Sequence, residues 1–363
     1  MVKAKKNMCI VAQHLGVSRS TVSLVLNGRE REARISTETA ERIRNYCREV
    51  GYLPNIHSRR MQSKIVRNIM VCVASSICSP DTDNVFSDGI FYNILGGVTT
   101  AAAKQQVTTT ICITNFNRPE TRETVFNRFR SREIDGMIFY GMDIPESWTQ
   151  DIIDEKFNIV GINSNPAAGI HNVDADNYGG TRSMVTEFLL KRGCKSFLFF
   201  GGTALSLVSR ERYRGFVDAL GAYGIYFSEK DYIKADFMED TAQKLAQEYI
   251  DSGAVLPDAI VCANDRMAIG VVKTLLANGV KIPDDVAVCG SEGIELARYT
   301  VPPIATFDQH SKEMGKCAFE LLWDKINGKE VENIVVDVNL VPGGTAPEAK
   351  FENDQQKSCC SKI

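Results

Sequence analysis

The chain has 363 residues, a net charge of −3 and 44% hydrophobic residues, enough for two or three domains with full cores. No run reaches the roughly 18 uninterrupted apolar residues of a membrane-spanning helix, and neither the eleven cysteines nor the four histidines have metal-binding spacing. Without a serine-nucleophile, P-loop or zinc-protease motif, we expect neither an enzyme nor a bound cofactor.

Residues 7–27 predict two short helices around a glycine turn. An apolar stripe at helical spacing is formed by Met8, Val11, Ala12 and Leu15. Gly16 suits the positive φ of a tight turn, and Ser18 can cap the second helix. Val22 and Val25 face the first helix and leave a polar outer face. This is a helix-turn-helix pattern, and an ordinary αα-hairpin is the alternative.

The charge distribution favours DNA binding over the ordinary hairpin. Residues 1–67 carry 14 Lys and Arg against five Glu, a net charge of +9, whereas the rest of the chain carries −12. Positive charge confined to one segment is typical of phosphate binding by that segment. We therefore expect a DNA-binding head.

A third helix is expected after Ser36, which can cap it. Ala40, Ile43 and Cys47 keep helical spacing, and Gly51 ends the helix. From Ile69 onward, apolar strand-like runs alternate with amphipathic helices. The expected strands are 69–74, 109–113, 136–140, 159–162, 197–200, 259–262 and 286–289. The expected helices are 90–105, 120–130, 178–192, 210–223, 241–252, 267–278 and 311–327.

This alternation predicts an α/β body of doubly wound parallel sheets in two lobes, with a ligand cleft between them at the carboxyl ends of the strands.

Several cysteines lie inside the strand-like runs, where we expect reduced thiols to serve as small core residues: Cys72, Cys112, Cys262 and Cys289.

Blocks of sequence along the chain resemble the lactose/galactose-repressor (LacI/GalR) family of bacterial transcription regulators. These blocks, in the family's order, are V-A-x-x-L-G-V-S-R-S-T-V-S-L-V-L-N-G in the head, then G-Y-L-P-N at 51–55, D-G-M-I-F at 135–139, R-x-x-G-F at 212–216, A-N-D-R-M-A-I-G at 263–270 and P-P-I-A-T-F-D-Q at 302–309. The resemblance covers about residues 7–345. It implies a three-helix head, a hinge and a two-lobed body like that of periplasmic binding proteins.

The expected domain boundaries follow from these patterns. The head spans 1–54, the hinge helix or linker 55–66, and the effector-binding and dimerisation body 67–345. Lobe 1 takes about 67–163 and 292–327, and lobe 2 about 164–291 and 328–345. The chain is thus expected to cross between lobes near Asn163, Ser291 and Asn327. Residues 346–363 are low in apolar content and are expected to be disordered.

The resemblance assigns DNA contacts by position. Arg19, Ser20 and Leu24 would read bases in the major groove. Phosphate contacts are implied for Thr21, Ser23, Asn27 and Tyr52, and Arg34 could also reach phosphate. In the hinge, implied contacts come from Asn55, Arg59, Arg60 and Met61, with Met61 as an apolar wedge in the minor groove. A plain basic linker is the alternative for this segment.

Ligand contacts are expected in loops that follow strands. The loop after the first strand offers Ser75, Asp83, Asn84 and Phe86. The second lobe offers Arg212, Asn264 and Glu292, the last replacing the family's usual aspartate. Alternatives are a helix–helix salt bridge for Arg212 and a helix N-cap for the pair Asn264–Asp265, with Asp265 well suited to capping.

The expected function is that of a dimeric, sequence-specific repressor whose affinity for double-stranded operator DNA is controlled by a small ligand, most simply a sugar or sugar derivative. The alternative is a cytosolic solute-binding protein of a transport system. The basic head argues against it, as does the N-terminus M-V-K-A-K-K-N, which lacks an apolar export segment. We expect a cytoplasmic homodimer without membrane contact. The sequence leaves open the effector, the direction of its effect, the operator, a possible protein corepressor, and dimer versus tetramer.

Overall fold

The computed structural model describes residues 7–26, 28–52, 65–74, 89–114, 119–141, 146–164, 170–203 and 206–347. The chain forms two units, Met1–Val66 and Arg67–Ile363, which we call the head and the body. In the described residues no single helix has the length and apolar composition needed to cross a membrane. Two helices, Met8–Leu15 and Arg19–Leu26, pass that test only when taken together, and they are bent by 107° relative to each other.

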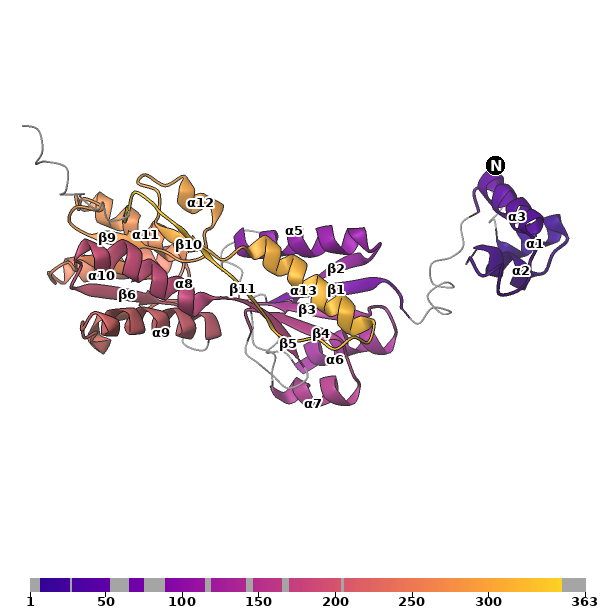
Figure 1. Ribbon diagram of the computed structural model, residues 1–363, viewed down its shortest axis with the longest axis horizontal. Coiled ribbons are helices and arrows are strands. Elements are labelled where there is room, and N and C mark those ends of the chain that lie inside the picture. Colours follow the sequence, from indigo (N-terminus) through magenta and orange to yellow (C-terminus); the bar gives the residue numbers. More distant parts are fainter. Residues whose placement is uncertain are drawn as a thin grey trace, which may run out of the picture. The chain divides into compact units, whose positions relative to one another are not determined.

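The head consists of three helices, α1 (Met8–Leu15), α2 (Arg19–Leu26) and α3 (Thr37–Val50) (Figure 1). Gly16 ends α1 with a φ of 65°, and the Ser18 hydroxyl accepts a hydrogen bond from the Thr21 amide at 2.9 Å. Ser36 caps α3 in the same way through Thr39, and Gly51 ends it with a φ of 62°. The predicted turn and caps are therefore confirmed.

A small apolar core joins these three helices. Its buried members are Val11, Ala12, Val22, Val25, Ala40, Ile43 and Cys47. All of them were expected to face inward from helical spacing. Because the polar side of α2 takes no part in this core, it stays available for another molecule.

The first sheet of the body has six parallel strands in the order β11-β5-β4-β3-β1-β2. Its strands are β1 (Asn68–Ala74), β2 (Thr108–Thr114), β3 (Gly136–Tyr140), β4 (Ile159–Ile162), β5 (His171–Ala175) and β11 (Ile334–Val336). Its helices are α5 (Gly89–Lys104), α6 (Pro119–Arg130), α7 (Glu146–Asp154) and α13 (Ser311–Ile326). Figure 1 shows α5 and α13 on one face of this sheet and α6 and α7 on the other.

The second sheet has four parallel strands in the order β7-β6-β8-β9. These are β6 (Phe197–Gly201), β7 (Tyr232–Lys234), β8 (Ala259–Cys262) and β9 (Ala287–Cys289), with β10 (Thr306–Asp308) and β12 (Asn339–Val341) paired antiparallel beside them. Helical segments are α8 (Asn177–Met184), a π-helical turn (Val185–Leu189), a 3-10 turn (Leu190–Arg192), α9 (Leu207–Ala222), a 3-10 turn (Glu229–Asp231), α10 (Glu239–Asp251), α11 (Asp265–Ala277) and α12 (Glu295–Arg298). The predicted two-lobed α/β body with parallel sheets is confirmed.

The chain crosses between the two sheets later than the sequence suggested. β5 and β11 pair in the first sheet, so the crossings lie between β5 and α8, between β10 and α13, and between β11 and β12. The expected crossings near Asn163, Ser291 and Asn327 are wrong in position. The cause is that β5, β10, β11 and β12 have only three to five residues each, too few to give a clear apolar pattern.

Close helix packing in the first lobe depends on two glycines. A Cβ at Gly97 of α5 would meet the carbonyl of Lys312, and one at Gly315 of α13 would meet the carbonyl of Ile94. Only glycine allows the two backbones to approach this closely.

The C-terminal tail begins later than the sequence suggested. Ala346 is fully buried and forms a β-bridge with Gly343, so the expected start of the disordered tail at residue 346 is wrong. Residues 348–363 lie outside the described residues.

Candidate functional site

A cavity of about 260 Å³ lies between the two sheets of the body. The first lobe contributes Gly89, Ile90, Tyr140, Gly141 and Asn163 to its wall. The second lobe contributes Thr203, Ser206, Val208, Asp236, Phe237, Met238, Asn264, Arg266, Glu292 and Ile294. Most of these residues follow the carboxyl ends of β3, β4, β6, β7, β8 and β9, which is where parallel α/β sheets bind ligands. The cleft is therefore in the predicted place.

Three residues of the cavity wall have a positive φ although they are not glycine. The values are 51° for Asn163, 70° for Phe237 and 114° for Glu292. Such backbone conformations cost about 1–3 kcal/mol each and gather at sites where a side chain must be held in one direction. Their clustering around one cavity marks it as functional.

Arg212 lies behind this wall rather than in it. Its side chain has no exposed surface. Nε donates to Asn177 at 2.8 Å, Nη1 to Glu292 at 3.0 Å and to the carbonyl of Ala263, and Nη2 to Gln309 at 3.4 Å. Asn177 and Gln309 stand at two of the three crossings between the lobes. The arginine thus connects the cavity wall, through Glu292, to the segments that join the lobes.

Asn264 lines the cavity and also caps α11. Its Oδ1 accepts from the Met267 amide at 2.9 Å, and its Nδ2 donates to the carbonyl of Phe237 at 3.0 Å. The sequence had favoured Asp265 for the cap, but Asp265 is fully buried and bonds Thr306 and the amide of Ile294 instead. Burial raises the pKa of Asp265 to about 8.

Sequence reasoning missed several lining residues, among them Phe237 and Arg266. Phe237 follows β7, which is too short to be recognised, and its ring occupies the space that a side chain at Gly202 would need. Arg266 lies in the first turn of α11, and within the described part of the chain no ion pair holds its guanidinium. The rule that ligands contact residues at and after strand ends would have found Tyr140, the last residue of a recognised strand, and Asn163, which follows another.

The predicted ligand contacts Ser75, Asp83, Asn84 and Phe86 lie outside the described residues. Of the other three, Asn264 and Glu292 line the cavity and Arg212 supports Glu292 from behind.

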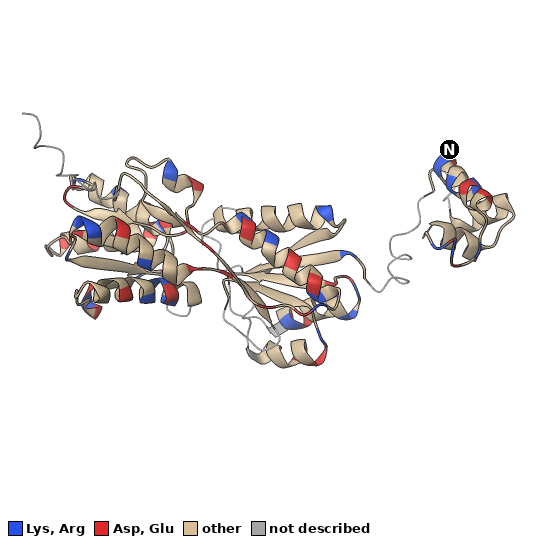
Figure 2. Cartoon of the chain, viewed as in Figure 1, with Lys and Arg blue, Asp and Glu red and all other residues tan. Residues whose placement is uncertain are grey.

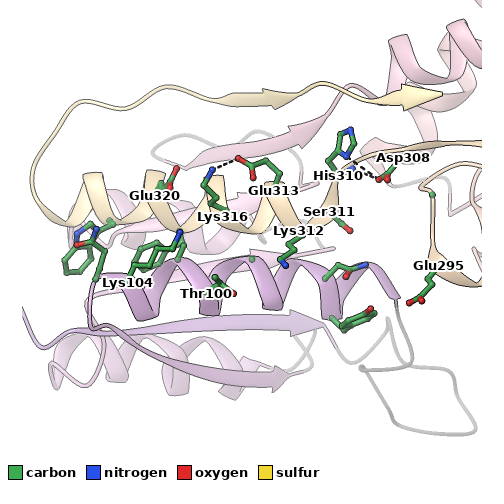
Figure 3. Close-up of a pocket in the computed structure, with 18 of the residues that line it drawn as sticks. Thr100, Lys104, Glu295, Asp308, His310, Ser311, Lys312, Glu313, Lys316 and Glu320 are labelled. Atoms are coloured by element: carbon green, nitrogen blue, oxygen red, sulfur yellow. Dashed lines mark hydrogen bonds and ion pairs between the residues drawn. The ribbon is translucent and has the colours of Figure 1, made fainter. Parts of the chain in front are cut away.

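A larger groove, of about 940 Å³, runs along α5 and α13 (Figure 3). Its charged side chains have both signs and contact one another, as in the pairs Lys316–Glu313 at 2.7 Å and Arg298–Asp308 at 3.6 Å. Most of its wall comes from the sides of helices, not from the carboxyl ends of strands. We therefore take the smaller cavity as the candidate ligand site.

In the head, the predicted base-reading face is open. Arg19 and Ser20 are exposed, and Thr21, Ser23 and Leu24 are partly exposed on α2. Arg34 is exposed in the turn before α3, whereas Tyr52 is partly buried against the head core. In Figure 2 the blue of Lys and Arg appears in the head, where α2 carries Arg19 and α3 carries Arg42, Arg44 and Arg48, whereas α1 has neither residue type. Asn27, Asn55, Arg59, Arg60 and Met61 lie outside the described residues.

Both units of the chain match known protein families. Residues 8–55 match the family described as bacterial regulatory proteins of the lacI family, and residues 186–346 match the periplasmic binding protein-like domain. The HTH-type transcriptional repressor PurR of Vibrio parahaemolyticus is 29% identical over 349 residues, which is 96% of this chain and 98% of that protein. The HTH-type transcriptional regulator CelR of Thermobifida fusca is 26% identical over 92% of this chain and 96% of that protein.

Solved structures have the same fold. The lac repressor dimer bound to operator and the anti-inducer ONPF has a TM-score of 0.79 at 21% identity, covering 94% of this chain and 99% of that one. The complex of the transcriptional regulator CelR with cellobiose has a TM-score of 0.69 at 24% identity, covering 94% of this chain and all of that one.

Proposed function

This chain belongs to the LacI family of bacterial regulatory proteins, and on that basis we propose that it is a homodimeric repressor in which the cleft between the lobes takes a small effector that controls operator binding. It is a DNA-binding transcriptional regulator, not a transport protein. We infer that it has no enzymatic activity and works in the cytoplasm, where its DNA partner is found.

For DNA recognition, we assign base reading to the exposed face of α2. Arg19 suits guanine O6 and N7, and Ser20 and Leu24 flank it on the same helix. Ser23, Asn27, Arg34 and Tyr52 are assigned to phosphates, as is Thr21, whose hydroxyl is 2.8 Å from that of Ser18. In the hinge we assign Met61 to the minor groove as an apolar wedge, with DNA contacts from Asn55, Arg59 and Arg60 beside it. Loss of DNA bending in Met61→Ala but not in Met61→Leu would support this role.

The observation that carries the regulatory part is the set of bonds around Arg212. A ligand that contacts Glu292 changes the partner of a fully buried guanidinium, which also bonds Asn177 and Gln309 at two lobe crossings. A ligand shifts an equilibrium only through different contacts in the two states, and this network supplies such a difference. Lobe orientation is thereby coupled to occupancy of the cleft.

We infer that the effector is a sugar or sugar derivative with about one ring. Amides, hydroxyls and carboxylates line the cavity together with the rings of Tyr140 and Phe237, which suits a ligand with polar edges and apolar faces. The guanidinium of Arg266 could bind an anionic group of the ligand. A ligand screen should therefore compare sugar phosphates with neutral sugars.

The homodimer is proposed from apolar residues exposed on the body. Ile111 and Ile113 on edge strand β2 are 39% and 47% exposed, and Tyr299 and Val301 after α12 are 72% and 85% exposed. Exposed apolar clusters of this kind are typical of protein interfaces.

A thermal-shift screen of neutral sugars, sugar phosphates, nucleosides and purines tests the cleft assignment. A ligand at 100 times its Kd should add about 2.7 kcal/mol of stability. The shift should be lost in Arg266→Ala if the ligand is anionic, and retained in Lys244→Ala, which removes one positive charge from the exposed side of the same lobe. Operator affinity is then measured with and without the stabilising ligand, which shows whether the ligand weakens or strengthens DNA binding. A hit that stabilises the protein without changing operator affinity would contradict the proposed regulation.

A further inference from the structure

Two cysteines face each other across the outermost strand pair of the first sheet. Cys72 on β1 and Cys112 on β2 are direct partners in the parallel register. Paired residues of adjacent strands lie on the same face of a sheet, about 4.8 Å apart, and this spacing lies within the Cα separation of natural disulfides, roughly 4.4–6.8 Å. The register therefore brings the two thiols to the same face of the sheet, at a Cα spacing that a disulfide can bridge.

The two thiols differ in access to solvent. Cys72 is fully buried among Met70, Met137 and Phe139, and its Sγ lies 3.1 Å from the Sδ of Met137. Cys112 is only partly buried because β2 is the edge strand, and its side chain points to the face of the sheet opposite to that of Ile111 and Ile113. The sequence predicted that both are reduced core residues; both are free thiols, and Cys72 lies in the core whereas Cys112 is only partly buried against it.

The surroundings also activate Cys112. The hydrogen of the Cys72 thiol can be directed to Met137 or to Cys112, and its hydrogen bond to Cys112 is the main cause that lowers the pKa of the Cys112 thiol to about 7. The positive charge of Arg128 on α6 acts in the same direction. A thiol that is a thiolate near neutral pH and reachable from solvent is the kind that reacts with oxidants.

We propose that Cys112 and Cys72 form a reversible dithiol–disulfide pair, in which Cys112 reacts with a hydroperoxide and Cys72 resolves the product. In the first step the Cys112 thiolate attacks the terminal oxygen of the hydroperoxide, an S–O bond forms and the O–O bond breaks. The OH group stays on sulfur as the sulfenic acid, and the alkoxide leaves as alcohol by taking up the proton that Cys112 released when it ionised. In the second step the Cys72 sulfur attacks the Cys112 sulfenic acid, the S–S bond forms, and hydroxide takes the Cys72 proton and leaves as water. Two thiols are oxidised by two electrons and one hydroperoxide is reduced to alcohol and water.

The disulfide would lie at the edge strand, where Cys112 is partly exposed. Exposed disulfides have more oxidising potentials and are more easily reduced than buried structural ones. A cellular dithiol should therefore reverse the modification, which distinguishes it from a permanent crosslink.

The test uses full-length protein and site-resolved mass spectrometry after titration with hydrogen peroxide. We expect a peptide pair linked through Cys72 and Cys112 that disappears with dithiothreitol. Cys72→Ala should instead accumulate a sulfenic acid at Cys112, trapped by dimedone, and Cys112→Ala should lose the linked pair. Cys317→Ala and Cys194→Ala are matched controls, since both thiols are partly buried and burial raises their pKa, and both variants should keep the linked pair.

A second measurement does not depend on variants. In the reduced wild-type protein at pH 7, iodoacetamide should alkylate Cys112 at least about fivefold faster than Cys194 or Cys317, because more of it is thiolate. Equal alkylation rates together with no linked peptide would overturn the proposal. A disulfide from Cys112 to any other cysteine in place of Cys72 would overturn the assignment of the resolving thiol.

Discussion

Arg212 and Glu292, 80 residues apart in the chain, form an ion pair of 3.0 Å in which the arginine is completely buried and the glutamate side chain keeps 15% of its surface exposed. The pair is asymmetric: one partner faces the cavity between the lobes and the other faces the segments that connect them. The backbone of Glu292 has a φ of 114°, in the region that favours glycine. This arrangement makes the pair a support of the fold and a route from the cleft to the lobe crossings.

Loss of the buried arginine should destabilise the body strongly. Arg212→Ala leaves the Glu292 carboxylate and the acceptors of Asn177 and Gln309 without their donor, and removing one partner of a buried pair costs about 3–5 kcal/mol. Urea denaturation of the full chain measures this. Lys244→Ala is the control: its ion pair with Glu248 is exposed on both sides, so the expected loss is below about 1 kcal/mol. Equal losses would mean that the Arg212 network contributes little.

The stability of the body should fall as the pH rises through about 8, because of Asp265. Burial raises the pKa of Asp265 to about 8 from 3.8, so between these values the folded state binds a proton that the unfolded state has released. This contribution is fully present below pH 4, falls progressively as the pH rises, and is completely lost above about pH 8. Asp265→Asn cannot ionise and keeps the size of the side chain. The stability difference between wild type and Asp265→Asn should therefore shift in favour of the variant between pH 6 and pH 9.

A constant difference over that pH range would contradict the raised pKa. Comparing the two proteins at each pH cancels other titrations, such as that of Lys325, whose pKa burial lowers to about 8.

Arg19→Ala should weaken operator binding by about 1–3 kcal/mol and relax the preference at one base pair in each half-site, because Arg19 is exposed at the start of α2. Arg34→Ala, in the turn before α3, should instead weaken binding to all sequences alike and reduce its salt dependence. A binding assay on a library of half-site variants separates the two patterns. Uniform weakening by Arg19→Ala would assign it to phosphate.

Introducing charge on edge strand β2 should separate the proposed dimer. In the double variant Ile111→Glu and Ile113→Glu, two like charges per chain would meet their counterparts across a twofold interface. Light scattering after size-exclusion chromatography should show a monomer. Val255→Glu changes a side chain that is 89% exposed in the second lobe and should leave the dimer intact. A dimer that survives the double variant would exclude β2 from the interface.

Filling the space at Gly202 should alter the cleft without altering the fold. A Cβ there meets the ring of Phe237, which must turn away from the cavity wall. Gly202→Ala should raise the Kd of the effector about tenfold, which corresponds to a loss of roughly 1.4 kcal/mol in binding free energy. The midpoint of unfolding should change little. Gly221→Ala, whose Cβ meets nothing within 4 Å, is the control and should bind normally. Isothermal titration with the effector identified by the screen measures both.

The sequence by itself determined those features that depend on local pattern. Helical spacing and the caps at Ser18 and Ser36 defined the head, because these signals act within one or two turns. Long apolar runs identified β3, β4 and β8 with their bounds, and strand–helix alternation required parallel sheets with a cleft at their carboxyl ends.

Only the tertiary structure decided the features that depend on distant contacts. The lobe crossings shifted because short strands such as β5 and β11 are held by pairing with each other, not by their own pattern. Arg212 could be read equally as a ligand contact or as a structural ion pair until its partners at Asn177, Glu292 and Gln309 were known. The Cys72–Cys112 pair depends on the register of β1 and β2, and Phe237 reaches the cavity wall only because Gly202 leaves it room. Local propensity carries no information about which distant residues meet, since that is set by how whole elements bury their surfaces together.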